Sequence, residues 1–430
     1  MRDVGTPSRS GMAQFLTLIC PSIRSSRTHR FYRSVGMILN APSLFQPLIA
    51  PFGMQHFSYM PRFGILGTYL PTPCGLATFS AALAGELIAR GADVDVVRIA
   101  DGDVSDEPNV AGELVNGSAS SVAATSELLN QSDVAVIQHE YGIYGGPDGD
   151  EVVQIMAGLR VPSIVVVHTV LKHPTRHQHS VLESVMALAD QVVVMSEVAR
   201  QRLCAGFAVD LDKVTTIPHG AALPSTNGVQ HPDRPTILTW GLLGPGKGIE
   251  RVIDAMASLK NLPGPPRYII AGRTHPKVLA AQGERYREAL VAQAKRLGVA
   301  DSVSFDAVYR APEELTAHIQ TATVVVLPYD SKDQVTSGVL VDSLASGRPI
   351  VATAFPHAVE LLGSGAGTVV AHDDPDALVA ALRQLLTDPR VADSMATEAR
   401  GLAPTIAWSV VANAYVGVAQ RLLVTQSALT

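Results

Sequence analysis

The chain has 430 residues, of which 47% are hydrophobic and 17% are charged, and its formal net charge is −6. This length exceeds what one ordinary core needs and predicts two domains, while the even spread of both charge signs argues against a nucleic-acid partner. No apolar run reaches the length of a membrane-spanning helix, so we expect a cytoplasmic protein with at most peripheral membrane contact. The three cysteines lie far apart in the sequence, which predicts reduced thiols and no metal site.

Residues 1–60 differ in composition from the rest of the chain. They contain six arginines against a single acidic residue, Asp3, and are rich in serine and proline without a helical or strand period. Such a composition is typical of a transit peptide, and it also suits a basic tether to anionic lipid. Because Met60 immediately precedes the first clear strand, we interpret the segment as a poorly ordered extension ahead of the folded domains.

From residue 61 onward, apolar strand candidates alternate with helical segments, which predicts an α/β fold built on parallel doubly wound sheets. A linker rich in Pro, Gly, Ser and Asn covers about residues 221–235 and separates two such sets. We therefore expect two Rossmann-like domains facing a cleft, at 61–225 and 236–405, and a final apolar helix at 406–424 that returns to the first domain. The strands are expected at 62–67, 94–99, 134–139, 164–168, 191–196 and 213–218, and then at 236–240, 267–272, 302–305, 323–328, 349–353 and 367–370.

Polar residues follow several strands of the first set. His139 and Glu140 end one strand and open a glycine-rich loop, and His168 ends the next. Ligands of open α/β sheets bind at the carboxyl ends of strands, so these side chains are candidate site residues. The turn after the first strand, which contains Gly67 and Gly75, does not have the glycine spacing of a dinucleotide-binding loop.

Two segments of the second set predict a site for phosphate. The loop 240–250 carries Gly246, Lys247 and Gly248 before a helix, where flexible glycines let the backbone approach an anion and the lysine adds a positive charge. No Ser or Thr follows Lys247, so the loop is not a P-loop. In the second segment, a helix begins near Ser337 and Gly338, and its free backbone N–H groups and dipole attract an anion.

The second segment also resembles a family pattern. Gln334 and Asp342 stand where the retaining nucleotide-sugar glycosyltransferases of family GT4, which have the GT-B fold, carry two acidic residues separated by seven others. The resemblance implies that residue 334 approaches the transferred sugar and that Asp342 binds the ribose. It places the distal phosphate of the donor on the backbone between them, at Ser337, Gly338 and Val339.

The resemblance assigns further roles. Lys247 matches the family lysine that neutralises the leaving diphosphate, beside Gly246, whereas Leu242 stands where the family has an arginine; Arg273 is a candidate to replace that charge. His168 matches the histidine beside the transferred sugar. The remaining matches are Gly75 below the donor phosphates and the acceptor, and Val308 and Tyr309 in the base-binding segment. We interpret His139 and Glu140, at the start of the glycine-rich loop, as acceptor-side residues.

We therefore expect a metal-independent, retaining transfer of a hexose to a hydroxyl of a glycan or small acceptor, with a nucleotide-diphosphate sugar as donor substrate and no cofactor. Residues 71–79 resemble a subgroup that includes mannosyltransferases of polysaccharide biosynthesis, which favours GDP-mannose over a UDP-sugar. One alternative is a non-catalytic nucleotide-sugar binding protein, because Gln334 and Leu242 replace two charged residues of the pattern. A nucleotide-sugar epimerase and a phosphorylase of the same fold are the others.

Overall fold

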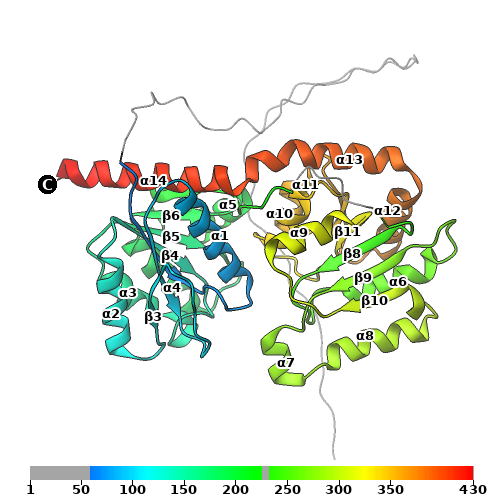
Figure 1. Cartoon of the computed structure of the whole chain (residues 1–430), viewed down its shortest axis with the longest axis horizontal. Coiled ribbons are helices and arrows are strands. Elements are labelled where there is room, and N and C mark those ends of the chain that lie inside the picture. Colours follow the sequence, from blue (N-terminus) through cyan, green and yellow to red (C-terminus); the bar gives the residue numbers. More distant parts are fainter. Residues whose placement is uncertain (1–58, 225–231, 430) are drawn as a thin grey trace, which may run out of the picture. The chain divides into compact units, whose positions relative to one another are not determined.

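The computed structural model describes residues 59–224 and 232–429, so the expected N-terminal extension and the middle of the linker lie outside the described residues. The first set of strands forms one parallel sheet in the order β3-β2-β1-β4-β5-β6-β7 (Figure 1). These strands are β1 (Phe63–Gly67), β2 (Val94–Ile99), β3 (Val110–Leu114), β4 (Val134–His139), β5 (Ser163–Val167), β6 (Gln191–Val194) and β7 (Val214–Thr216).

The second set of strands forms another parallel sheet, in the order β10-β9-β8-β11-β12-β13. In both sheets the first strand lies near the middle, the next two strands extend the sheet to one edge, and the later strands extend it to the other edge, as in doubly wound α/β folds. The strands are β8 (Thr236–Trp240), β9 (Arg267–Ala271), β10 (Val303–Asp306), β11 (Val324–Leu327), β12 (Ile350–Thr353) and β13 (Thr368–Val370).

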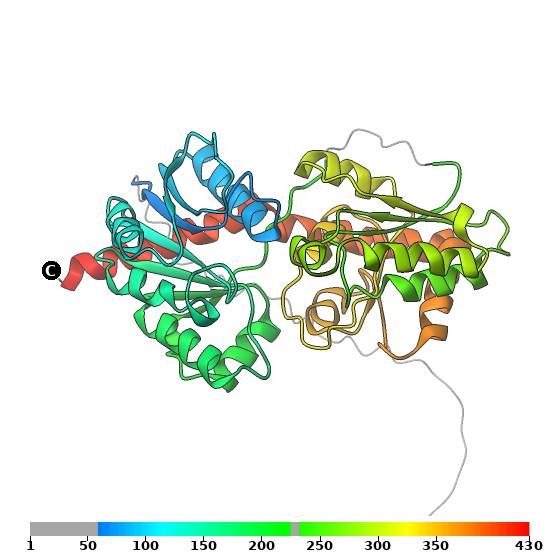
Figure 2. The same cartoon turned by 90° about the horizontal axis from the view of Figure 1, so that it is seen from below.

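Helices connect the parallel strands of both sheets (Figures 1 and 2). In the first half they are α1 (Gly75–Ala89), α2 (Ala119–Leu129), α3 (Glu151–Ala157), α4 (Arg176–Leu188) and α5 (Glu197–Gly206). In the second half they are α6 (Ile249–Leu259), α7 (Pro276–Gln282), α8 (Arg285–Arg296), α9 (Pro312–Gln320), α10 (Gly338–Ala345), α11 (Pro356–Leu362), α12 (Pro375–Thr387), α13 (Pro389–Leu402) and α14 (Trp408–Leu429). None of the helices in the described ranges is both long and apolar enough to cross a lipid bilayer.

Each sheet is covered on both faces, which explains the nearly continuous apolar runs of its central strands. Neighbouring residues of β1 illustrate this, because Ile65 belongs to one hydrophobic cluster with Leu83 of α1, and Leu66 belongs to the opposite cluster with Val152 of α3. Successive side chains of a strand point to opposite faces, so two buried faces require apolar residues at every position.

The final helix packs on the first sheet. Val411, Tyr415 and Ala419 of α14 are buried in the cluster that contains Phe63 of β1. Arg90, just after α1, donates hydrogen bonds to Ser409 O and to the Asn413 side chain. Helix α14, which follows the second sheet in the chain, is thus attached to one face of the first sheet.

Two local features were not predicted from the sequence. β3 is an edge strand whose residues alternate between half-buried and exposed until the buried Leu114, so it lacks the apolar run that marks the central strands. Helix α1 begins at Gly75, because Cys74 is its N-cap and its Sγ accepts a hydrogen bond from Ala77 N.

Candidate functional site

A pocket lies in the second half where the strand order changes direction, between β8 and β11. This is the place where open α/β sheets bind ligands. Its volume is about 420 Å³. The lining residues come from the two loops that follow these strands: Pro245, Gly246, Lys247, Tyr329, Asp330, Ser331 and Gln334.

Lys247 gives the pocket an unpaired positive charge. Its Nζ lies 4.6 Å from the centroid of the Tyr329 ring, a cation–π contact, and within the described residues no carboxylate pairs with it. Burial lowers the pKa of Lys247 from its ordinary value. The backbone is tightly held there, because Gly248 has φ of +64° and a Cβ atom at this position would lie 1.8 Å from Pro328 O. The lysine is therefore fixed at the pocket without a partner of opposite charge.

The start of α10 lies beside the same pocket. Ser337 is its N-cap, and its Oγ accepts a hydrogen bond of 3.2 Å from Leu340 N. Ser337 N donates to Nδ1 of His357, at 2.9 Å, while the N–H groups of Gly338 and Val339 belong to the first turn, which has no intrahelical acceptor. A Cβ at residue 338 would lie only 2.9 Å from Nε2 of His219, so glycine is required at this contact.

Gln334 and Asp342 lie at the two ends of this segment. Gln334 lines the pocket, and its Nε2 donates to Thr336 O at 3.0 Å, so the amide is held against its own loop. Asp342 is half-buried in α10, burial raises its pKa to about 7, and its carboxylate has no hydrogen-bond or ion-pair partner in the described part of the chain. The hydroxyl of Thr336 is also buried without a partner among the described residues. Asp342 and Thr336 are thus polar residues of this segment whose side chains have no partner in the described part of the chain.

Arg273 lies after β9 and is exposed, with its guanidinium carbon 5.9 Å from the centroid of the Tyr309 ring. Val308 and Tyr309, in the loop after β10, are exposed as well. None of these three residues lines the pocket. His275 interacts electrostatically with Lys247. The pKa of His275 is lowered first by burial and then by the positive charges of Lys277 and Lys247. Sequence reasoning missed His275. Its position is set by two backbone hydrogen bonds, in which Leu243 N donates to Arg273 O and His275 N donates to Leu243 O.

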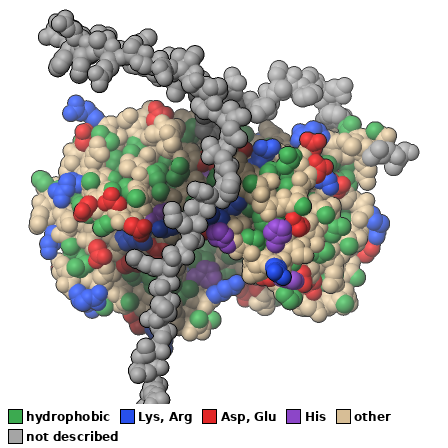
Figure 3. Space-filling model, turned by 180° about the vertical axis from the view of Figure 1, so that it is seen from behind, with side chains coloured by type: hydrophobic (Ala, Val, Ile, Leu, Met, Phe, Trp, Pro, Cys, Tyr) green, Lys and Arg blue, Asp and Glu red, His purple; other side chains and the backbone are tan. Residues whose placement is uncertain are grey.

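In the first half, His168 is held from two sides. Its Nε2 lies 2.6 Å from Oε1 of Gln138 in β4, and the Phe79 ring of α1 packs edge-on against it with centroids 5.0 Å apart. The pKa of His168 is lowered to about 3 by burial and by the nearby His219 and His139. Histidine side chains gather on the face shown in Figure 3. The imidazoles of His168, His139 and His219 are neutral at pH 7, since burial also lowers the pKa of His139 and of His219 to about 4.

The two predicted acceptor-side residues have different environments. The His139 side chain is buried, packs edge-on against Tyr141, and leaves Nδ1 without a partner within the described residues. Glu140 is half-buried and accepts hydrogen bonds from the Thr169 hydroxyl and from Tyr141 N. Burial raises the pKa of Glu140, and these hydrogen bonds and Lys277 oppose that rise. Glu140 is therefore the more accessible of the pair.

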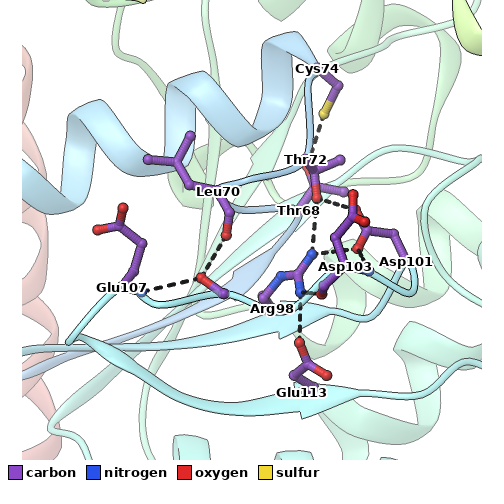
Figure 4. Close-up of polar contacts among 10 residues, drawn as sticks. Thr68, Leu70, Thr72, Cys74, Arg98, Asp101, Asp103, Glu107 and Glu113 are labelled. Atoms are coloured by element: carbon purple, nitrogen blue, oxygen red, sulfur yellow. Dashed lines mark hydrogen bonds and ion pairs between the residues drawn. The ribbon is translucent and has the colours of Figure 1, made fainter.

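Gly75 begins α1, and a Cβ atom at this position would meet no other atom within 4 Å. The loop before it is fixed by Arg98, whose side chain is fully buried in β2. Arg98 contacts Asp101, Glu113, the Asp103 carbonyl and the Thr72 hydroxyl, so it joins the β1–α1 loop to the segment after β2 (Figure 4). A lone arginine in an apolar strand was the available signal, but its partners could not be predicted.

The loop that carries Gln334 also contacts the first half. Val335 is buried in the hydrophobic cluster of the first sheet that contains Val167, Val170 and Val194. Ser196 Oγ donates to Val335 O at 2.6 Å, and Arg202 Nη1 donates to Asp333 O at 2.6 Å. In addition, the Glu360 carboxylate of α11 accepts hydrogen bonds from the N–H groups of Glu197 and Val198 at the start of α5.

Two family models match the chain in succession. Residues 73–223 match the model described as Glycosyltransferase Family 4, and residues 227–402 match the model described as Glycosyl transferases group 1. Together the two matches cover the second sheet and all strands of the first sheet except β1. The chain belongs to the GT4-type glycosyltransferases. The resemblance inferred from Gln334, Asp342 and Lys247 is thereby confirmed at the level of the family.

This glycosyltransferase is similar to a named bacterial enzyme. The GDP-mannose-dependent alpha-(1-6)-phosphatidylinositol monomannoside mannosyltransferase of Mycolicibacterium smegmatis is 31% identical to it over 230 residues, which are 49% of this chain and 57% of that protein. The chain thus spans little more than half of the relative's length. Within the described residues of the glycosyltransferase, no group of His, Cys, Asp and Glu side chains could hold a metal ion.

Solved structures confirm the GT-B fold of the glycosyltransferase. A glycosyltransferase from Rickettsia africae matches with a TM-score of 0.68 and 12% identity, covering 85% of this chain and 99% of the other. Anabaena HepE, solved in complex with UDP and glucose, matches with a TM-score of 0.67 and 16% identity, covering 84% of this chain and 100% of the other. At such low identity these similarities establish the fold alone.

Proposed function

We propose that this glycosyltransferase transfers a hexosyl group, mannose, from a nucleotide-diphosphate sugar to a hydroxyl of a glycan or small acceptor, with retention of configuration at the anomeric carbon. The observation that carries the proposal is Lys247, an ammonium group without a carboxylate partner in the described chain, at a pocket beside the start of α10. An unpaired, half-buried cation next to a helix N-terminus is complementary to a diphosphate.

In the proposed reaction the anomeric C–O bond to the donor phosphate breaks and a bond from the acceptor oxygen forms on the same face of the sugar. The acceptor proton passes to the departing phosphate oxygen, so the products are the glycoside and the nucleoside diphosphate. Lys247 and the N–H groups of Gly338 and Val339 stabilise the negative charge that develops on that phosphate. Because these groups supply the positive charge, we propose a reaction without a metal ion. Gln334 would donate or accept a hydrogen bond with the donor sugar.

The remaining site residues have proposed roles that follow the family pattern. Asp342 would accept hydrogen bonds from the ribose hydroxyls, and the loop with Val308 and Tyr309 would contact the base. The relative from Mycolicibacterium smegmatis is described as GDP-mannose-dependent, which supports GDP-mannose as the donor. Glu140, whose carboxylate is half-buried after β4, is the proposed acceptor-side residue. We propose action in the cytoplasm, at most at the surface of a membrane.

The first experiment is a thermal shift measurement with GDP, UDP and ADP. A ligand that binds the native state raises its melting temperature according to occupancy. We expect GDP to raise the melting temperature most, and Lys247→Ala to abolish that rise. Lys260→Ala removes an exposed lysine just after the same helix and serves as the matched control, which keeps the rise. Absence of a rise with every nucleotide, or equal loss in both variants, would contradict the proposed donor site.

One observation favours a non-catalytic nucleotide-sugar binding protein as the second candidate. The Gln334 amide is hydrogen-bonded to Thr336 O of its own loop, which leaves fewer groups for the sugar. The two candidates differ in turnover. Release of GDP or free mannose from GDP-mannose, with the enzyme at substoichiometric amounts, supports the transferase, whereas binding without any release supports the binding protein.

A further inference from the structure

Gln138 lies at the carboxyl end of β4 in a fixed conformation. Its side chain is fully buried, and its backbone carbonyl accepts a hydrogen bond of 2.7 Å from the Tyr144 hydroxyl. A Cβ at residue 67, on the neighbouring strand β1, would lie 2.8 Å from Cγ and 2.9 Å from Cβ of Gln138. Glycine at position 67 therefore makes the space that the Gln138 side chain occupies.

The side-chain oxygen of Gln138 contacts a single imidazole nitrogen. Oε1 lies 2.6 Å from Nε2 of His168, and the backbone N–H of His168 donates to His139 O at 3.1 Å, which sets the register of the two strand ends. The edge-on Phe79 ring restrains the imidazole from another side. The ring of His168 is thus oriented by contacts from β4 and α1.

This contact selects one tautomer of His168. With the Gln138 amide oriented so that Oε1 faces the ring and its Nε2 has no partner within the described residues, the carbonyl oxygen accepts a hydrogen bond from His168 Nε2–H, and in the neutral ring Nδ1 is left with a lone pair. Nδ1 has no hydrogen-bond partner in the described ranges, although the side chain is only half-buried. Neutrality at pH 7 follows from the pKa of about 3. The imidazole therefore presents an acceptor, and only an acceptor, at Nδ1.

We propose that Gln138 is a positioning residue that holds His168 as the Nε2–H tautomer, so that Nδ1 accepts a hydrogen bond from a sugar hydroxyl. The contact between Nδ1 and a sugar hydroxyl rests on the proposed function. A hydroxyl donates such a bond, whereas an ionised phosphate oxygen does not, so this tautomer favours a sugar and disfavours a phosphate at that place. Gln138 acts only through His168 and need not touch the substrate.

The charged or titratable groups near His168 are few within the described chain. His219 packs on the same Phe79 ring, and His139 is the neighbour of Gln138 in β4; both are neutral at pH 7. The Glu140 carboxylate is bonded to the Thr169 hydroxyl, next to His168 in sequence. A new carboxylate at residue 138 would therefore be the closest negative charge to the imidazole.

The test uses nitrogen-15 NMR of the imidazole rings in the full chain, with His168 assigned by a His168→Asn variant. In the native protein we expect the Nε2–H tautomer of His168, unprotonated at pH 5. In Gln138→Glu, the carboxylate should raise the titration midpoint of His168 by about 1–3 pH units, so that the imidazolium signal increases at pH 5. Donor consumption by this variant should fall as the pH decreases through the same midpoint.

Two further variants keep the test decisive if the Gln138→Glu protein does not fold. Gln138→Met keeps the shape but removes the acceptor, and Gly67→Ala displaces the Gln138 side chain without altering it; both should give a mixture of His168 tautomers. Gln191→Met is the matched control, because Gln191 is another buried glutamine of the same sheet that bonds to Lys213 O and Thr215 instead. A native Nδ1–H tautomer, or unchanged His168 signals in Gln138→Met, would overturn the positioning role.

The same spectra separate this inference from the proposed function. Addition of GDP-mannose should shift the Nδ1 signal of His168, and a saturating addition that leaves the signal unchanged would overturn the contact with sugar. If the native tautomer is Nε2–H and depends on Gln138 but no nucleotide sugar binds or reacts, the proposed function fails while the role of Gln138 in fixing His168 stands.

Discussion

At the scale of single residues, this glycosyltransferase keeps polar groups at its pocket that do not stabilise the fold. Lys247 contacts an aromatic ring instead of a carboxylate, and Asp342 is half-buried without a partner in the described chain. Such groups cost folding free energy, and they persist at sites where a ligand compensates them. Two predictions follow from this trade between stability and binding.

Replacement of Lys247 by alanine should reduce donor consumption far more than stability. Loss of one group that stabilises developing charge lowers turnover by roughly 100- to 1,000-fold. The melting temperature of the free protein should stay equal or rise, because the variant no longer buries an unpaired ammonium group. Lys247→Arg keeps the charge and should retain part of the activity. A large fall in melting temperature of Lys247→Ala would show instead that the lysine is structural.

Asp342 should make the free protein less stable as the pH rises. Its pKa in the folded protein is about 7, above the value of about 3.9 in an unfolded chain, so the folded state holds the proton more tightly. Stability is therefore greatest below pH 4 for this group and declines between pH 4 and 7, by on the order of 2–4 kcal/mol at most. The free energy of unfolding of Asp342→Asn, measured with urea from pH 4.5 to 7.5, should gain on that of the native protein as the pH increases. A constant difference across that range would contradict this prediction.

At the scale of elements, the start of α10 depends on a side chain from the next helix. His357 of α11 accepts the Ser337 N–H through Nδ1, and burial and the nearby His219 lower its pKa to about 3. The histidine therefore acts as a neutral acceptor for one helix donor and leaves the next N–H groups for the proposed phosphate. Residues of α10 and α11 therefore together set the geometry of the proposed phosphate site.

His357→Ala should leave Ser337 N–H unsatisfied and lower the free energy of unfolding by about 1–3 kcal/mol at pH 7. His357→Asn, whose side-chain oxygen can accept the same bond, should recover part of this loss. The pKa of His357 is depressed from its unfolded value of 6.5, so its neutral form stabilises the fold above pH 6.5, and that contribution decreases as the pH falls toward 3. Urea unfolding at pH 7 and pH 5 measures both effects; equal stability of Ala and Asn variants would contradict the hydrogen-bond role.

The sequence was most informative where strands are buried on both faces. β2, β4 and β8 were predicted with the bounds that the structure has, because their apolar runs are bounded by turn residues. β3 was missed since it is a half-exposed edge strand. The family resemblance assigned Lys247 and the segment that begins at Gln334 to one donor, and the loops that carry these two residues line one pocket. Contacts of His357, His275 and Gln138 were missed, because a side chain that bonds a distant segment leaves no local periodicity.

At the scale of the whole molecule, the two sheets are joined by specific contacts besides α14. The Glu360 carboxylate accepts two N–H groups at the start of α5, Ser196 binds Val335 O, and Val335 is buried among first-sheet residues. A carboxylate at a helix N-terminus satisfies donors that otherwise lack partners and interacts favourably with the helix dipole.

Glu360→Ala should therefore weaken the coupling between the two sheets. We expect a loss of about 1–3 kcal/mol from the unpaired N–H groups of Glu197 and Val198. In calorimetry the single melting transition should broaden or divide, with the two halves unfolding separately. Glu398→Ala, on the exposed face of α13, is the control that leaves the transition unchanged. An unchanged melting profile of Glu360→Ala would show that the hydrogen bonds of Glu360 to Glu197 and Val198 contribute nothing to the cooperativity of unfolding.

The position of Val335 has a consequence for how such enzymes can be recombined. Its side chain completes the core of one half while its neighbour Gln334 lines the pocket of the other. A chimera that grafts the second half of another enzyme onto this first half would import a foreign residue into the first core and a foreign backbone opposite Ser196. Successful grafts should therefore require the host's residues at 333–335 to be retained, so the boundary between exchangeable modules runs through this loop and not only through the linker.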